Sequence, residues 1–338
     1  MDKESVIRIL NGVKYPPYDK SIVQFGFVKE VRIDGSSVKI GLYTGAGEEK
    51  NAALAAEIKK LVETSFAGAK AEIEILASDP AKTAAPAPSE ETLKGVKLKI
   101  AVASGKGGVG KSTVAANLAR AFSKIFSTGN AARVGLMDCD IHGPSAGILF
   151  GEIPQPTTDG VKIFPPEHGG IKAISMGMLV DPSQPLIWRG PMITSAIKQF
   201  ANDVEWGELD AMVLDLPPGT GDAVISVGQT IPLDGALIVT TANRLAEATA
   251  TRGAKIFEKM GIPVLGVVEN MAYMEMPDGT RMKLFGEGGA KACAEDLGTK
   301  VLAQIPIDPA LQGENPPEAS RAVFDLLASE ILGAVGRK

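Results

Sequence analysis

One short run constrains this chain more than any other part of its sequence, because its glycines, lysines and hydroxyl residues have the spacing of a phosphate-binding loop. The run consists of Gly105, Lys106, Gly107, Gly108, Val109, Gly110, Lys111, Ser112 and Thr113. An apolar segment of strand length, 98–104, precedes it, and apolar residues at helical spacing follow it over 114–122. Strand, glycine loop and helix is the context in which backbone N–H groups surround phosphate oxygens. The sequence therefore predicts a site for a nucleoside triphosphate.

The side chains of this loop suit charge neutralisation around a bound triphosphate. Lys111 is predicted to neutralise the β- and γ-phosphates, and the hydroxyl of Ser112 is predicted to ligate Mg²⁺. The glycines allow the backbone N–H groups to turn inward at the start of the following helix. A glycine-rich turn without a ligand is the structural alternative, but the flanking strand and helix favour phosphate binding.

Carboxylates follow two further apolar segments of strand length. Asp138 and Asp140 come after the first of these segments, and Asp215 closes the segment 211–214. Because ligands of parallel sheets bind at the carboxyl ends of the strands, we expect these carboxylates to face the nucleotide. Asp215 is predicted to hold the hydrated Mg²⁺, and the Pro-Pro-Gly run after it is predicted to move when the γ-phosphate leaves. An aspartate-rich turn with a helix cap at Ser145 is the alternative for the first pair.

The run 106–113 resembles the deviant Walker A loop, in which a second lysine follows the first glycine. That loop occurs in a family of dimeric P-loop ATPases that includes MinD-type proteins, the nitrogenase iron protein and the Mrp/ApbC iron–sulfur carriers. The runs 138–145 and 215–222 resemble the two switch segments of the Mrp/ApbC members. The resemblance covers residues 96 to about 330, and it implies a homodimer that binds and hydrolyses ATP.

The resemblance also implies roles for individual residues. Lys106 would reach across the dimer interface to the nucleotide of the other protomer, and Asp140 would orient the attacking water. Asp138 would lie on the Mg²⁺ side of the site. Without the resemblance, Lys106 is better explained as a solvated surface lysine. Trp188 and Arg189 belong to another string that resembles Mrp/ApbC sequences; they carry no assigned chemistry, and an exposed pair at a dimer face is an equal alternative.

The base of the nucleotide is predicted to lie beside Asn270, which follows the apolar segment 264–268 and Glu269. An asparagine side chain offers both a donor and an acceptor, so it can read an adenine edge. In the family that the chain resembles, an asparagine at this position contacts the base, and Pro306 and Asp308 would lie over its other side. These residues favour ATP over GTP as the ligand.

From residue 96 onward, apolar segments of strand length alternate with helical patterns. This alternation predicts an α/β fold, a P-loop NTPase with a mostly parallel sheet flanked by helices. The ATPase domain is expected to span 96–338. A flexible linker rich in proline and alanine is expected to precede it over 77–95.

Residues 1–76 are predicted to form a small α+β domain. Its expected elements are helices over 3–10 and 48–66 and strands over 27–33, 37–42 and 71–76. This order of elements, together with the run 21–29, resembles the small domain of iron–sulfur assembly factors that occurs at the N-terminus of many Mrp proteins. An appendage used only for contacts is the alternative.

Composition argues against several classes of partner. The net charge of −5 without a long basic run argues against nucleic acid, and no apolar stretch reaches the ~20 residues of a membrane span. The hydrophobic fraction of 45% is enough for buried cores in about two domains. Two cysteines cannot form a disulfide framework, and the first residues lack the apolar core of a signal peptide. We therefore expect a cytoplasmic protein.

One feature of the Mrp carriers is missing. These proteins typically place a Cys-x-x-Cys pair a few residues after the Glu-Asn-Met run, and two chains then bridge a [4Fe–4S] cluster. Met276 and Gly279 stand at these positions, and neither side chain is a good iron ligand. Cys139 and Cys293 are predicted to be packed positions rather than ligands. A [4Fe–4S] cluster is therefore not expected in the usual site.

Two functions follow from these observations. The first is a role in iron–sulfur protein maturation with an atypical or absent cluster site, in which a client apo-protein or an assembly factor would be the partner. The second is a cluster-free, ATP-switched adaptor that presents Met274, Met276 and Met282 to a client protein. The N-terminal domain favours the first function, and the missing cysteine pair favours the second. The Mrp-like strings argue against a membrane-surface ATPase of the MinD type.

Overall fold

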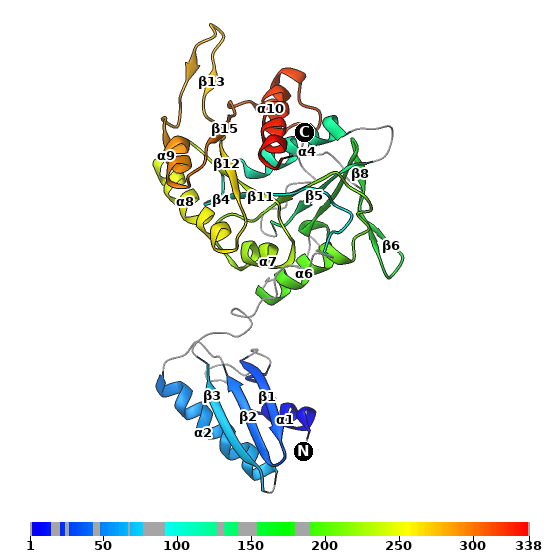
Figure 1. The fold of residues 1–338 in the computed structure, drawn as a ribbon, viewed down its shortest axis with the longest axis vertical. Coiled ribbons are helices and arrows are strands. Elements are labelled where there is room, and N and C mark those ends of the chain that lie inside the picture. The colour runs from blue at the N-terminus through cyan, green and yellow to red at the C-terminus, as the bar shows by residue number, and fades with distance from the viewer. Residues whose placement is uncertain are drawn as a thin grey trace. The chain divides into compact units, whose positions relative to one another are not determined.

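The computed structural model describes residues 2–14, 21–23, 27–42, 48–66, 68–76, 92–126, 132–140, 154–179 and 190–336. The chain forms two compact units that meet in sequence between Pro86 and Ala87 (Figure 1). This point falls inside the segment 77–95 that was predicted as a linker, and residues 77–91 of that segment lie outside the described residues.

The first unit is a three-stranded sheet with two helices. Its elements are α1 (Lys3–Leu10), β1 (Val28–Asp34), β2 (Ser37–Leu42), α2 (Glu48–Ser65) and β3 (Lys70–Ile75). Strand β1 pairs with β2 in antiparallel orientation, and β2 pairs with β3 in parallel orientation. The predicted elements are therefore confirmed to within a residue at most ends. The helices bury Leu10, Ile58 and Val62 against the apolar face of the sheet.

The second unit is built on an eight-stranded sheet in the order β15-β12-β11-β4-β10-β5-β9-β8, in which only β8 runs antiparallel to its neighbour. These strands are β4 (Lys99–Ser104), β5 (Val134–Asp138), β8 (Glu167–His168), β9 (Ile171–Ser175), β10 (Ala211–Asp215), β11 (Gly235–Thr240), β12 (Val264–Glu269) and β15 (Val301–Gln304). Four of the central strands are buried along their whole length or nearly so, as expected when helices cover both faces of a parallel sheet.

Helices cover both faces of this sheet (Figure 1). Their bounds are α4 (Lys111–Phe126), α6 (Gly190–Asn202), α7 (Asp222–Thr230), α8 (Arg244–Lys259), α9 (Gly289–Asp296) and α10 (Glu318–Ala334). Helices α4 and α10 pack together on one face, and α6 to α9 contribute to the core on the other. The mostly parallel sheet between helices confirms the predicted fold class.

Short elements complete the second unit. They are β6 (Thr157–Thr158), β7 (Ile163–Phe164), the 3₁₀ turns η1 (Met176–Leu179) and η2 (Pro309–Gln312), and the two strands β13 (Met274–Glu275) and β14 (Arg281–Met282). Strands β13 and β14 form a hairpin, which projects away from the sheet in Figure 1. None of the helices in the described ranges has both the length and the apolar composition needed to cross a bilayer.

Candidate functional site

The glycine loop lies between β4 and α4, at the carboxyl end of the central strand of the sheet. Gly105 packs directly against α8, where a Cβ on this residue would stand 2.1 Å from the carbonyl carbon of Thr249. Gly110 has φ +78°, and a Cβ there would stand 2.1 Å from Nδ2 of Asn270. Glycine is therefore required at both positions by close packing, in addition to any contact with phosphate.

This packing predicts that Gly105→Ala destabilises the large unit far more than Gly108→Ala does. An added methyl at Gly105 would collide with helix backbone, and overpacking of this kind costs about 3 kcal/mol of unfolding free energy. Gly108 has φ +80°, but a Cβ there meets nothing within 4 Å. Alanine at this position should therefore cost only about 1 kcal/mol of backbone strain. Urea unfolding of the nucleotide-free variants measures both costs; equal losses would contradict the predicted packing role.

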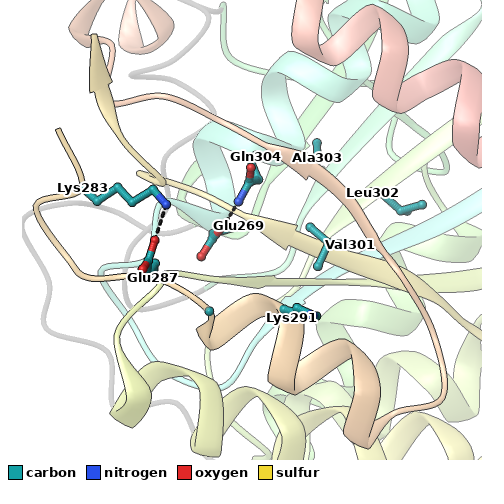
Figure 2. A pocket seen from close by; sticks show the side chains of 9 residues that line it. Glu269, Lys283, Glu287, Lys291, Val301, Leu302, Ala303 and Gln304 are labelled. Carbon is teal, nitrogen blue, oxygen red and sulfur yellow. Dashed lines mark hydrogen bonds and ion pairs between the residues drawn. The ribbon is translucent and has the colours of Figure 1, made fainter. Parts of the chain in front are cut away.

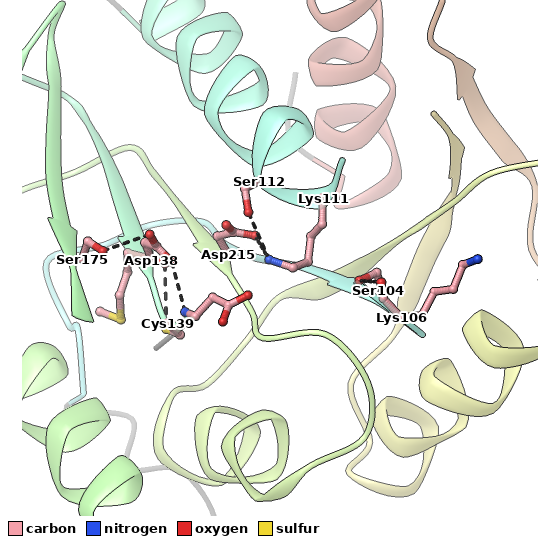
Figure 3. A network of polar contacts seen from close by, with 10 residues as sticks. Ser104, Lys106, Lys111, Ser112, Asp138, Cys139, Ser175 and Asp215 are labelled. Atoms are coloured by element: carbon pink, nitrogen blue, oxygen red, sulfur yellow. Dashed lines mark hydrogen bonds and ion pairs between the residues drawn. The ribbon is translucent and has the colours of Figure 1, made fainter. Parts of the chain in front are cut away.

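Lys111 and Asp215 form the centre of the site (Figure 3). The Lys111 ammonium forms an ion pair with Oδ1 of Asp215, and both side chains are almost completely buried. Nζ of Lys111 also lies 3.4 Å from the hydroxyl of Ser112. The structure therefore brings together the predicted phosphate-binding lysine and two of the predicted metal ligands.

Asp138 is the last residue of the neighbouring strand β5, and Asp140 follows just after its end. Asp215 is in register with Asp138, since β10 pairs with β5. Oδ2 of Asp138 accepts a hydrogen bond of 2.9 Å from Ser175, and Oδ1 accepts one of 3.0 Å from the backbone N–H of Asp140. All three carboxylates are buried at the same edge of the sheet, as the strand order requires.

The pKa of Asp215 is raised to about 6. Burial is the main cause, the nearby Asp138 adds to it, and the Lys111 ammonium opposes it. Hard oxygen donors with concentrated negative charge suit Mg²⁺, and a cation at this point would relieve the cost of keeping Asp215 ionised. Ser112 and Asp215 therefore fit the predicted metal site.

The raised pKa predicts that Mg²⁺-dependent nucleotide binding weakens in mild acid. Because the folded protein holds this proton more tightly than an ordinary aspartate does, Asp215 becomes protonated as the pH falls through about 6. Below this pKa, each further drop of one pH unit should reduce the Mg²⁺-dependent part of the nucleotide affinity by about tenfold. Titrations with a fluorescent ADP analogue at several pH values, with Mg²⁺ and with EDTA, measure this part. A Mg²⁺ enhancement that stays constant down to pH ~5 would contradict the assignment.

Lys106 is the one predicted catalytic residue that does not join this network. Its ammonium points away from the Lys111–Asp215 pair (Figure 3), and it forms no ion pair with any described residue. Only its backbone takes part locally, since the carbonyl accepts a hydrogen bond of 3.0 Å from Ser104. The side chain is partly exposed.

The Pro-Pro-Gly run after Asp215 lies against the glycine loop. The backbone N–H of Gly219 donates to the carbonyl of Ser104 over 2.8 Å, so it is engaged with the end of β4. This run was predicted to move when the γ-phosphate leaves, and Gly219 supplies its single backbone N–H, since proline has none. The contact ties the second switch segment to the start of the glycine loop.

Asn270 contacts the glycine loop itself. Its Nδ2 donates a hydrogen bond of 2.8 Å to the carbonyl of Val109, and the side chain is buried. Asp308 caps the 3₁₀ turn η2 by accepting from the N–H of Ala310, and it also accepts from the hydroxyl of Ser320. Asn270 and Asp308, two of the residues predicted to bind adenine, therefore make hydrogen bonds within the protein in this structure. The bond of Asn270 uses its amide nitrogen; the acceptor atom of its side chain is Oδ1.

The positions where a cysteine pair was expected form the turn of the β13–β14 hairpin. The N–H of Met276 donates to the carbonyl of Thr280, and the N–H of Gly279 donates to the carbonyl of Met276, both over 2.8 Å. Gly279 has φ +81°, a conformation that glycine adopts readily. These residues supply a tight turn and no thiolate.

The two cysteines are buried. Cys139 directly follows Asp138 in sequence, Cys293 lies on α9, and both side chains belong to the apolar core on one face of the sheet. Burial raises the pKa of both thiols, and neighbouring carboxylates add to the effect. Both observations agree with the predicted packing role, and no group of three or more His, Cys, Asp or Glu side chains suited to a metal occurs within the described ranges.

A hollow lies beside this hairpin, at the edge of the sheet formed by β15 (Figure 2). Val301, Leu302 and Ala303 form an apolar wall, and Lys283 and Glu287 form an ion pair at the rim. Glu269 lines the hollow as well; its Oε2 accepts from Gln304, while its Oε1 has no hydrogen-bond partner among the described residues.

Apolar side chains are exposed next to the hollow. They are Met282, Leu284 and Phe285, with 47%, 49% and 44% of their surfaces accessible. We call these three residues the hairpin surface. Of the three methionines predicted to contact a client, Met282 is exposed, and Met274 and Met276 are half-buried.

Two supporting residues escaped the sequence analysis. Ser175, at the end of β9, holds the carboxylate of Asp138. Asn117 is buried on α4, where its Nδ2 donates to the carbonyls of Thr113 and Leu311 over 2.9 and 3.0 Å. A polar residue on an otherwise apolar helical face was the available signal for Asn117. No comparable signal marked Ser175, because its strand pairs with β5 only in the folded sheet.

Some predicted site features fall outside the described residues. The first switch segment is described only as far as Asp140, so its continuation, including Ser145, is not. The same holds for Trp188 and Arg189.

Comparison with known proteins places the two units in context. Residues 95–326 match the family model described as NUBPL iron-transfer P-loop NTPase, and residues 3–75 match the model described as iron-sulfur cluster assembly protein. A protein of Synechocystis sp. named iron-sulfur cluster carrier protein is 37% identical, over 98% of this chain and 97% of the relative.

Solved structures are similar in fold to part of this chain. A nucleotide-binding protein from Archaeoglobus fulgidus, solved in complex with ADP, is 38% identical with a TM-score of 0.57 and covers 71% of this chain and 90% of its own. The cell division ATPase MinD of Pyrococcus furiosus is similar in fold, with 21% identity, a TM-score of 0.50 and coverage of 70% of this chain and 98% of its own.

Proposed function

Because this chain belongs to the NUBPL iron-transfer P-loop NTPase family, we propose that it is a Mg²⁺-dependent ATPase that acts as a homodimer in the maturation of iron–sulfur proteins. The observation that carries the proposal is the cluster of the buried Lys111 and Asp215 with the half-buried Ser112 at the glycine loop, in a chain that also carries an assembly-type domain. The ADP bound to the relative from Archaeoglobus fulgidus supports a nucleotide as the ligand of this loop.

We assign the chemistry to the chain's own side chains as follows. When ATP enters, Lys111 exchanges Asp215 for the β- and γ-phosphate oxygens, which frees the Asp215 carboxylate for the metal. Ser112 and Asp215 would hold Mg²⁺, and the bound ion would supply charge neutralisation at the phosphates. Asp140 orients the attacking water, and Asp138, fixed by Ser175, supports the metal side of the site.

Lys106 completes the site in the proposed dimer. Its ammonium points away from the Lys111–Asp215 pair of its own protomer, which supports a role at the nucleotide of the other protomer. A cation supplied in this way neutralises charge that builds up on the transferred phosphoryl group. Asn270 would offer Oδ1 to the amino group of adenine, with Pro306 and Asp308 nearby on the next segment.

The [4Fe–4S] cluster of Mrp carriers does not fit the residues present at its usual position. Met276 and Gly279 form a hairpin turn, and both cysteines are buried. We therefore propose that the chain works without a thiolate-bound cluster of its own and acts on a client apo-protein or with an assembly factor.

A transfer assay tests the maturation role. A scaffold protein loaded with a [4Fe–4S] cluster is mixed anaerobically with apo-aconitase, and recovery of aconitase activity is followed with this chain and Mg²⁺-ATP. We expect faster recovery with ATP than with ADP, and no acceleration by Lys111→Ala. Equal rates with and without the chain would contradict the role.

The hairpin surface favours a second candidate, a cluster-free adaptor that is switched by ATP. Three exposed apolar residues beside an apolar-walled hollow suit contact with a client protein. On this proposal, Phe285→Ser abolishes client binding while ATP hydrolysis by the chain continues, and Val161→Ser, at another exposed apolar residue, is the matched control. If Phe285→Ser also prevents the maturation of aconitase, the hairpin surface serves both proposed functions. If maturation and client binding are both unchanged, the hairpin surface is not the client-binding site.

A further inference from the structure

The hollow beside the β13–β14 hairpin follows an open edge of the large sheet (Figure 2). Its lining includes all four residues of β15, Val301–Gln304. Because successive side chains of a strand point to opposite faces of the sheet, a hollow on one face would meet only alternate residues. Contact with four consecutive residues therefore places the hollow along the edge of the strand, where its volume is about 780 Å³.

Strand β15 is the last strand of the sheet on this side. It pairs with β12, and no other strand in the described ranges pairs with it. In an edge strand, alternate backbone N–H and C=O groups point outward and can pair with a further strand. The residues Val301–Gln304 include no charged side chain and no proline, which are the residues that commonly block such pairing. The edge is therefore suited to accept another strand.

The charges around the hollow leave one carboxylate oxygen without a partner. Oε2 of Glu269 accepts from Gln304, whereas Oε1 has no hydrogen-bond partner among the described residues, although the side chain is only 4% exposed. Both lysines of the lining already form ion pairs with other carboxylates, in the pairs Lys283–Glu287 and Lys291–Glu295. Because a buried acceptor without a donor is unfavourable, the hollow suits an occupant that brings a positively charged donor to Glu269.

We propose that the hollow binds an extended segment of a client protein, which pairs with β15 as a further strand and brings a lysine or arginine to Glu269. Glu269 and Gln304 are paired residues of β12 and β15, and their side chains meet on the same face of the sheet. An added strand would lie two strand spacings, or roughly 10 Å, from β12. Lysine and arginine have the long stems needed to extend past Gln304 towards Oε1 of Glu269.

The hairpin surface extends this binding site. Lys283, which lines the hollow, lies between Met282 and Leu284 in the sequence. In strand addition the backbone hydrogen bonds supply affinity, and the contacts of alternate side chains supply specificity. Apolar side chains of the added segment would find their contacts on the hairpin surface. The inference rests on the adaptor function proposed above and specifies the kind of client segment that it recognises.

Peptide binding to the full chain tests the proposal. The probe is a short fluorescent peptide in which valine and lysine alternate, and its affinity is measured by fluorescence anisotropy at constant ionic strength. Two comparison peptides have the same charge but carry methyl groups on the backbone nitrogens of either the valines or the lysines. At least one of them should bind about tenfold more weakly or worse, because a strand that cannot donate to β15 cannot pair with it.

Glu269→Gln tests the charged contact separately. The variant keeps the size of the side chain and an acceptor for Gln304, and thermal unfolding verifies that the fold is kept. It should weaken binding of the lysine peptide by about tenfold, the loss expected for one charge-assisted hydrogen bond. Binding of a peptide in which valine and glutamine alternate should be unchanged. Glu258→Gln, at an exposed glutamate of α8 outside the hollow, is the matched control with the same change in charge.

The proposal is overturned if the lysine peptide does not bind the wild-type chain, or if both methylated peptides bind as well as the unmodified one. Equal binding of the lysine peptide by Glu269→Gln and Glu258→Gln would overturn it too. None of these measurements involves ATP hydrolysis or aconitase. Failure of peptide binding therefore leaves the maturation role standing, whereas normal peptide binding together with an unaffected client in Phe285→Ser would contradict the adaptor function alone.

Discussion

Lys106→Ala is expected to reduce ATP hydrolysis by at least about 1,000-fold, the lower end of the effect of a cation supplied across an interface. The reason is geometric: this ammonium points away from the Lys111–Asp215 pair of its own protomer, and in the proposed dimer it contributes to catalysis at the site of the second chain. Nucleotide affinity should change little, because Lys111 and the backbone of the loop remain. Steady-state release of phosphate measures the turnover.

Lys255→Ala is a suitable control for this variant, since Lys255 is exposed on α8. It should hydrolyse ATP at the wild-type rate. Mixing Lys106→Ala with Lys111→Ala sharpens the test, because each mixed dimer then contains one site with Lys111 from one chain and Lys106 from the other. Activity that returns on mixing supports action in trans. Unchanged turnover by Lys106→Ala alone would contradict the predicted role.

Asp215→Asn is expected to remove the Mg²⁺ dependence of nucleotide binding and to destabilise the free protein. The variant leaves the buried Lys111 ammonium without its carboxylate partner, and breaking a buried ion pair in this way costs about 3 kcal/mol of unfolding free energy. Binding of ADP in EDTA should be retained, because Lys111 remains available for phosphate. Binding should no longer tighten when Mg²⁺ is added.

Asp210→Asn separates these two effects. Asp210 lies at the other end of the same segment and pairs with Lys97 and Arg133, so its loss should lower stability without altering the response to Mg²⁺. Equilibrium unfolding and ADP titrations on both variants give the comparison. A Mg²⁺ enhancement in Asp215→Asn equal to that of Asp210→Asn would rule out Asp215 as a metal ligand.

The sequence was sufficient for those parts of the site that depend on local pattern. The spacing of glycine and lysine in the loop predicted a strand before it and a helix after it. The carboxyl ends of β5 and β10 brought Asp138 and Asp215 together because neighbouring parallel strands end at one edge. The alternation of strands and helices was likewise sufficient for the fold class.

Contacts between distant segments could not be predicted in the same way. The hydrogen bond from the Asn270 amide to the carbonyl of Val109 was not predicted, because it depends on how β12 lies beside the loop. The ion pair of Lys111 with Asp215 joins residues 104 positions apart. The close approach of Gly105 to α8 likewise depends on the three-dimensional packing of a helix. Each of these contacts is decided by side-chain packing, which has no signature in the spacing of residues.

Anaerobic reconstitution with iron and sulfide, followed by counting of both elements, tests most directly the claim that this ATPase acts in iron–sulfur maturation without a thiolate-bound cluster of its own. The buried cysteines and the hairpin turn at Met276 and Gly279 predict no stably bound iron and no absorbance band near ~400 nm, where thiolate-bound clusters absorb. About four irons per dimer, lost on Cys293→Ala, would contradict the account and establish a cluster held by ligands outside the usual pair.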